Sequence, residues 1–229
     1  PEGITTIGKY AFSFSSSISE VIIPDSVKSI ADYAFYKCDG LANISLSKNL
    51  ELMGEYAFGN CSSLVTINIP SKLKGIEEGS FTGCSSLRSV VLSEGLTYIS
   101  TWAFENCSSL IYVKIPSTLT AINTMAFDGC TSMTTAGPLG GGYNYEFLWK
   151  EEIPDSIFGW NENLTKVVIP TGIMCIGAEA FYSCTNLVSV ELRPGIKEIE
   201  RSAFSNCSSL QGIVFPESIE TLGSSAFDE

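Results

Sequence analysis

The sequence contains no histidine among its 229 residues, which removes the usual means of enzyme catalysis near neutral pH. Without an imidazole there is no Ser-His-Asp triad, no Cys-His nucleophile pair and none of the commonest metal ligand. The sequence also lacks a Gly-Lys-Ser/Thr phosphate loop and the glycine fingerprint of dinucleotide-binding folds. Carboxylate pairs of the glycosidase kind remain open, but no pair stands out. We therefore predict a protein that is not an enzyme and needs no cofactor and no metal.

Basic residues are scarce as well. The chain has 13 Lys and Arg against 25 Asp and Glu, a formal charge of −12. Phosphate backbones and anionic lipid surfaces repel such a chain, so we expect no nucleic acid partner. No run of about 18 apolar residues is present, so we expect no membrane insertion by this segment. The acids are scattered, which predicts a solvated surface rather than an acidic binding patch.

What the sequence does contain is a repeat built around a phenylalanine. This residue recurs ten times, and eight of the nine intervals are 23 residues long. The remaining interval is 31 residues, 8 more than the period. Such a period is the signature of a solenoid whose repeats pack only on their neighbours. The residues are Phe12, Phe35, Phe58, Phe81, Phe104, Phe127, Phe158, Phe181, Phe204 and Phe227.

Other positions repeat in phase with this Phe. An aliphatic residue or Met lies five positions before it, and Cys usually lies three positions after it. An apolar pair two positions apart follows, as in Ile67 with Ile69, often with Pro next. That pair has the period of a strand with one buried face. We predict one short strand per repeat in a parallel sheet, with extended chain and tight turns elsewhere, because no helical period is sustained.

The combination Leu-x-x-Ile-x-Ile-Pro, Leu-x-x-Ile and Ala-Phe-x-x-Cys-x-x-Leu resembles the BspA-like bacterial leucine-rich repeats over essentially the whole chain. One full copy is Leu64, Ile67, Ile69, Pro70, Leu73, Ile76, Phe81 and Cys84. The resemblance implies a right-handed leucine-rich-repeat superhelix, with a parallel β-sheet on the concave face and a mostly irregular or extended convex side. It also implies a secreted or surface-attached protein of bacteria or some protozoa, in a family associated with adhesion to host proteins and other cells.

We expect residues 1–229 to form a single solenoid of about ten turns. Neither end carries a recognisable cap, and an uncapped solenoid exposes a slice of its core. We therefore expect a fragment of a longer protein, with any signal peptide and anchor outside it.

One copy of the repeat, between Cys130 and Phe158, departs from the motif. Lys150 stands at an aliphatic position, Asn161 replaces Cys and Ile157 replaces Ala. The extra residues fall within 137–150, where a glycine run precedes four alternating aromatic residues: Gly140, Gly141, Gly142, Tyr143, Tyr145, Phe147 and Trp149. Insertions in repeat arrays often lie on the binding face, and Tyr and Trp are enriched in hot spots. The alternative is that these rings cover the gap left in the core.

Eight cysteines are present, and seven share one column of the repeat. Stacked parallel side chains would leave neighbouring Cβ atoms about 5 Å apart, too far for a disulfide. A single row of thiols also cannot surround a metal tetrahedrally. We predict buried, unreactive free thiols. Cys175 is the exception, because it precedes the core residue Ile176, points outward and is predicted to be reactive.

The outward face of the predicted strands is a second candidate site. It shows no single chemical theme, and Tyr112 with Lys114 is its only bulky polar centre. Ordinary solvated strand residues are the alternative interpretation. The face consists of Glu20, Ile22, Asn43, Ser45, Thr66, Asn68, Ser89, Val91, Tyr112, Lys114, Thr135, Lys166, Val168, Ser189, Glu191, Gly212 and Val214.

Together these features predict a non-catalytic protein-binding or adhesion module of a secreted or cell-surface protein. Its expected partners are host or neighbouring-cell surface and extracellular proteins, bound by a monomer. A structural spacer that presents other domains, and a carbohydrate-binding module that stacks sugars on the same rings, are the alternatives. The candidate ligand-binding residues are Tyr143, Tyr145, Phe147, Trp149, Tyr112, Lys114, Asn68 and Glu191.

Overall fold

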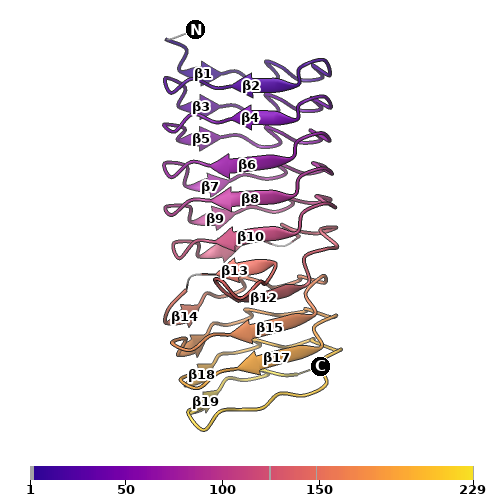
Figure 1. Cartoon of the computed structure of the whole chain (residues 1–229). Helices are drawn as coiled ribbons and strands as arrows, with labels where there is room; N and C mark the ends of the chain where they lie inside the picture. The colour runs from indigo at the N-terminus through magenta and orange to yellow at the C-terminus, as the bar shows by residue number, and fades with distance from the viewer. Residues whose placement is uncertain (1–2, 124, 148, 229) are drawn as a thin grey trace.

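The computed structural model describes residues 3–123, 125–147 and 149–228 and shows a parallel-strand β-solenoid of about nine turns (Figure 1). Successive turns stack into one column, with the two ends of the chain at opposite ends of it. In these ranges the structure contains no helix, and hence none that could cross a membrane. The predicted solenoid with a parallel sheet is confirmed.

The predicted strands form the broad face of the solenoid. β2 (Glu20–Ile22) pairs with β4 (Asn43–Ser45), and a seven-stranded sheet continues the same face. In spatial order its strands are β17 (Ser189–Leu192), β15 (Lys166–Ile169), β12 (Thr135–Pro138), β13 (Tyr145–Phe147), β10 (Tyr112–Ile115), β8 (Ser89–Leu92) and β6 (Thr66–Ile69). Only β13 was not expected from the repeat. The predicted strand at Gly212 and Val214 does not form, and glycine there weakens strand pairing.

The repeat pattern predicts one strand per turn, and the structure shows a second, two-residue strand on the opposite side. A strand of two residues is too short to show a period in the sequence. These strands form three sheets: β1 (Thr6–Ile7), β3 (Ser29–Ile30) and β5 (Leu52–Met53); β7 (Gly75–Ile76), β9 (Tyr98–Ile99) and β11 (Ala121–Ile122); and β14 (Glu152–Ile153), β16 (Cys175–Ile176), β18 (Glu198–Ile199) and β19 (Thr221–Leu222).

In the turns from Phe12 to Phe204, a residue with a left-handed backbone lies two positions before the Phe and another lies two positions after it. In one turn these are Tyr33 and Lys37, both with φ of 56°. A non-glycine residue in this conformation costs about 1–2 kcal/mol. The cost is offset because the N–H groups of both residues donate to carbonyls of the next turn, as the Phe35 N–H does to Ala57 at 2.8 Å. Three backbone hydrogen bonds thus join successive turns at this place.

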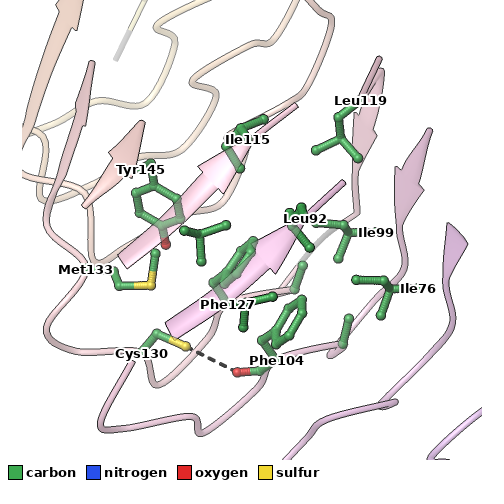
Figure 2. Close-up of a cluster of buried hydrophobic side chains, with 14 of the residues drawn as sticks. Ile76, Leu92, Ile99, Phe104, Ile115, Leu119, Phe127, Cys130, Met133 and Tyr145 are labelled. Atoms are coloured by element: carbon green, nitrogen blue, oxygen red, sulfur yellow. Dashed lines mark hydrogen bonds between the residues drawn. The ribbon is translucent and has the colours of Figure 1, made fainter. Parts of the chain in front are cut away.

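The phenylalanine and cysteine columns form the core. Neighbouring Phe rings stack with centroids 4.9–5.5 Å apart and planes within 13° of parallel. The seven column cysteines are buried free thiols, as predicted. Each also donates to the carbonyl of the Phe one turn earlier, as Figure 2 shows for Cys130 and Phe104. Burial raises the pKa of the Cys84 thiol to about 12, which keeps this donor protonated.

Candidate functional site

The insertion adds a strand to the sheet. The chain leaves β12 at Pro138, turns through residues 139–144 and returns as β13, which pairs in parallel with both β12 and β10 (Figure 1). Tyr145 lies in register between Val113 and Ala136. The other strands of this sheet follow chain order, whereas here the chain steps back by one place. The insertion therefore separates two turns that would otherwise be neighbours.

Asn144 joins the inserted strand to both sides. Its Oδ1 accepts hydrogen bonds from the N–H groups of Thr134 and Thr135, at 3.0 and 3.2 Å. Its Nδ2 donates to the Ile111 carbonyl at 2.7 Å, and its own carbonyl accepts from the Val113 N–H at 2.8 Å. Asn144 thus links the chain at β10 to the chain at β12, because these two strands do not pair directly with each other. No motif in the sequence predicts this role for Asn144.

Three of the four predicted binding rings lie in the core. Tyr145, Phe147 and Trp149 are 0%, 2% and 8% exposed. Tyr145 stands edge-on between Phe127 and Phe158, at 5.4 and 5.6 Å, and bridges the interruption in the Phe stack. Figure 2 shows its ring beyond Phe127 in the same cluster. This burial corrects the expectation of an exposed aromatic patch, because the apolar side of an alternating strand faces the core.

The same rings compensate for the departures from the motif. Lys150 is exposed, and Trp149 beside it is buried and donates from Nε1 to the Leu119 carbonyl at 3.0 Å. Asn161, in the cysteine column, donates from Nδ2 to the Tyr145 hydroxyl at 3.2 Å. The packing therefore follows the alternative interpretation, in which the rings cover the gap in the core.

The outward side of β13 holds Glu146 beneath the glycine loop. Its carboxylate accepts hydrogen bonds from the N–H groups of Gly140 and Gly142, at 3.0 and 2.8 Å, and from the Tyr112 hydroxyl at 3.2 Å. Glu146 is only 5% exposed, and burial alone would raise its pKa. The donors outweigh burial and hold the pKa of Glu146 below its usual value. This satisfied, buried carboxylate fixes the loop on the sheet.

The loop places Tyr143 on the outer surface of the sheet. Its ring covers Gly137 and Gly141, where an added Cβ would lie 2.5 and 2.4 Å from ring carbons. Tyr143 is partly exposed, as are Tyr112 and Lys114, and Lys114 is the register partner of Glu146. These residues surround Glu146 on the outward side of the sheet. We call this group the strand-face platform: Tyr112, Lys114, Tyr143 and Glu146.

The other predicted site residues lie apart from the platform. Asn68 is exposed on β6, two strands from Lys114, with Val91 between them in register. Glu191 is exposed on β17 and forms a 3.1 Å ion pair with Arg193. Val168 was expected to face solvent and is instead buried, on the strand next to β12. The structure thus places Tyr112 and Lys114 on β10 to one side of Glu146 and the Tyr143 ring over Gly137 to the other side, and it leaves Asn68 and Glu191 farther along the sheet.

A stack of tyrosines lies on the turns away from this face. The rings of Tyr10, Tyr33 and Tyr56 follow one another at 5.2 Å intervals, and Tyr10 is 54% exposed. The Lys9 ammonium lies 5.5 Å from the centre of the Tyr10 ring. These tyrosines lie two positions before Phe12, Phe35 and Phe58, so their 23-residue spacing is a sequence signal for the stack.

Cys175 does point outward, on β16, but it lies among acids. Its Sγ is 3.6 Å from the Glu200 carboxylate, and Glu152 and Glu198 are its register partners. Burial, followed by the charge of Glu200, raises the pKa of Cys175 to about 12. We therefore expect an unreactive thiol at this position, in place of the reactive thiol predicted from the sequence. Potential ligand atoms of Cys175, Glu198 and Glu200 lie within 4.8 Å of one another, but proximity alone does not make a metal site.

Comparison with known proteins identifies the repeat. The family model described as the BspA type leucine-rich repeat region matches residues 5–134 and 151–229 in six copies and leaves out β12, the loop and β13. A search of curated protein sequences finds no match.

The chain is similar to several solved structures. A leucine-rich repeat protein from Eubacterium ventriosum aligns with 100% of the chain at 27% identity and a TM-score of 0.57, and the chain spans 63% of that protein. The T. pallidum leucine-rich repeat protein aligns with 88% of the chain at 24% identity and a TM-score of 0.54, over 80% of its own length. A leucine-rich cell surface protein from Faecalibacterium prausnitzii aligns with 98% at 25% identity and a TM-score of 0.46, over 74% of its length.

Proposed function

Since the chain belongs to the BspA-type leucine-rich repeat family, we propose that it is a non-catalytic protein-interaction module that binds its partner, as a monomer, on the strand-face platform. We further propose that the module acts at the bacterial cell surface or outside the cell, on host or neighbouring-cell proteins. Family membership supports this location. The repeats form a scaffold, and the specific surface must come from side chains that the scaffold displays.

The observation that carries the proposal is the fixation of the glycine loop by Glu146. Three donors hold its carboxylate, so the loop and Tyr143 need little further ordering when a partner binds. Preordered contact residues lose less conformational entropy on binding, which leaves more of the contact energy as affinity. Tyr is also enriched among hot-spot residues. A partly exposed Tyr143, held by this loop on the outer surface of the sheet, therefore supports a protein contact.

The test is a binding array of purified host extracellular and cell-surface proteins, probed with three forms of the chain. Tyr143→Ala removes the platform ring, and Tyr10→Ala is a matched control because Tyr10 is 54% exposed on a distant turn. We expect a bound protein to lose about tenfold or more in affinity with Tyr143→Ala, equivalent to about 1.4 kcal/mol, and nothing with Tyr10→Ala. Equal binding by all three forms would place the contact elsewhere. No binding to any protein would favour a spacer.

A further inference from the structure

A hollow lies on the turn side of the solenoid, at the junction where the inserted strand enters the sheet. There β13 keeps β10 and β12 two ladder spacings apart, about 9.6 Å. Pro154 stands where intact turns donate to the previous turn, as Gly177 does to Ile153 at 2.9 Å. Because proline has no N–H, this bond cannot form across the junction. The two-residue strands on either side, β11 and β14, accordingly belong to different sheets.

The hollow is large enough for a small ligand at its mouth only. Its volume of about 410 Å³ falls within the range of about 300–1,000 Å³ that is typical of ligand sites. Deeper in, the space bordered by Phe127 and Ile157 holds about 20 Å³, enough for one water molecule. A ligand must therefore lie across the outer surface of the turns. We call the mouth the turn-side hollow, and its lining includes Thr101, Asn123, Ser156, Trp160, Glu179 and Tyr182.

Trp160 supplies an aromatic surface in this hollow. Its side chain is 50% exposed, and its ring packs edge-on to Tyr182 with centroids 5.3 Å apart. Its N–H also donates to the Tyr182 carbonyl at 2.7 Å. Both the ring and the backbone of Trp160 thus contact the next turn, so the indole loses little conformational entropy when a ligand covers it.

Polar side chains line the hollow around this ring. Asn123 and Ser156 are exposed, and Thr101 is partly exposed. They offer one amide group and two hydroxyl groups, which together donate and accept hydrogen bonds. The hollow therefore combines a flat apolar surface with polar groups of both kinds.

The charges of the hollow disfavour an ionic ligand. Among the described residues that line it, Glu179 alone is charged, and its carboxylate is paired with Arg201 at 3.0 Å. Asp128 and Glu162 border the narrow inner space, where they would repel an anion. A ligand without net charge, with an apolar face and hydroxyl groups at its edge, fits these surroundings.

We propose that the turn-side hollow binds a neutral oligosaccharide, with one sugar ring stacked on Trp160. The C–H groups on the face of a sugar ring meet the negative face of the indole. Its hydroxyl groups exchange hydrogen bonds with Asn123, Ser156 and Thr101. The hollow draws its lining from four successive turns, so it is longer than a single sugar ring and accommodates a chain of them.

The turn-side hollow is separate from the strand-face platform. None of the residues that line the hollow belongs to the platform. Oligosaccharide binding here therefore stands or falls independently of the function proposed for the platform, and Tyr143→Ala should leave it unchanged.

The test probes an array of neutral, sialylated and sulfated glycans with the full chain, and then titrates a bound glycan by calorimetry. Trp160→Ala removes the stacking ring. Phe14→Ala is the matched control, because Phe14 follows Phe12 by two positions as Trp160 follows Phe158, and Phe14 is 66% exposed. Circular dichroism verifies that both variants fold.

We expect neutral glycans to bind, and to lose about tenfold or more in affinity with Trp160→Ala but not with Phe14→Ala. Asn123→Ala should weaken binding by a smaller factor, and Trp160→Phe should retain part of it. Absence of binding to every neutral glycan would overturn the proposal. So would equal affinity in Trp160→Ala and the unmodified chain, or binding of sialylated or sulfated glycans alone.

Tryptophan fluorescence gives a second measurement. A sugar that covers Trp160 should shift the emission of the unmodified chain to the blue, because the indole leaves water. The glycan should bind Trp160→Phe without this shift, since Trp102 and Trp149 lie outside the lining of the hollow. The same shift in both proteins would place the sugar elsewhere and contradict the proposal.

Discussion

The Cys130 thiol donates a hydrogen bond to the carbonyl oxygen of Phe104, 3.2 Å away in the preceding turn. The same contact recurs along the column at 3.0–3.3 Å. At the junction opened by the insertion the column residue is Asn161, and the Phe127 carbonyl accepts from Asn163 Nδ2 at 3.2 Å instead. The cysteine column is therefore a ladder of hydrogen bonds between turns as well as a row of small apolar groups.

Substitutions at Cys107 separate these two roles. Cys107→Ala removes both the sulfur and the donor to the Phe81 carbonyl, and we expect it to lower the free energy of unfolding by about 1–2 kcal/mol. Cys107→Ser keeps a donor, so its loss should be smaller. Urea unfolding followed by circular dichroism measures both. A serine variant less stable than the alanine variant would mean that the column acts through apolar packing alone.

Alkaline pH should destabilise the fold through the same column. Burial raises the pKa of Cys84 to about 12 and that of Cys207 to about 11, from 9.0. Above pH 9 the unfolded chain releases these protons while the folded chain retains them, so the free energy of unfolding falls as pH rises through this window. Between pH 9 and 12 the urea midpoint should fall less steeply for Cys84→Ala than for the unmodified chain. Both proteins contain the same tyrosines, so tyrosine titration cannot cause a difference between the two curves. Parallel curves would argue against the buried thiol.

Loss of the Glu146 carboxylate should release the glycine loop. Glu146→Gln removes the charge that holds the Gly140 and Gly142 amides, so both should exchange faster, and Glu191→Gln on the same face should leave them unchanged. Because the folded pKa of Glu146 is lowered, its contribution is present above pH 4.5 and is lost as pH falls through the folded value. The loop should therefore loosen in acid in the unmodified chain only. If the Gly140 and Gly142 amides exchange at the same rate in Glu146→Gln as in the unmodified chain, the carboxylate does not fix the loop.

Cys175 should react slowly with Ellman's reagent at neutral pH, because only the thiolate attacks and its pKa is raised to about 12. Glu200→Gln removes a neighbouring negative charge and should accelerate the reaction. Glu217→Gln, an exposed acid outside this cluster, should have no effect. A native-state rate equal to that of an unfolded chain would restore the original prediction.

Much of the fold could be predicted because the same residue pattern recurs along the chain with a fixed period. The Phe, Cys and aliphatic columns all follow from one period, and their burial follows from stacking. The place of β13 could not be predicted, because a single segment with no repeat leaves open which strands it pairs with. The alternation of Tyr145 and Phe147 did suggest an extended segment with one apolar side, and Glu146 lies on the opposite side for the same reason. Tyr143 breaks the alternation because it precedes the strand.

The most direct measurement of the central claim is the hydrogen-exchange footprint of the chain bound to a protein identified by the array. We predict protection in β10 and in the loop at residues 139–144, on the platform side of the sheet. Protection confined to turns at either end of the solenoid, with the platform amides unchanged, would contradict the account.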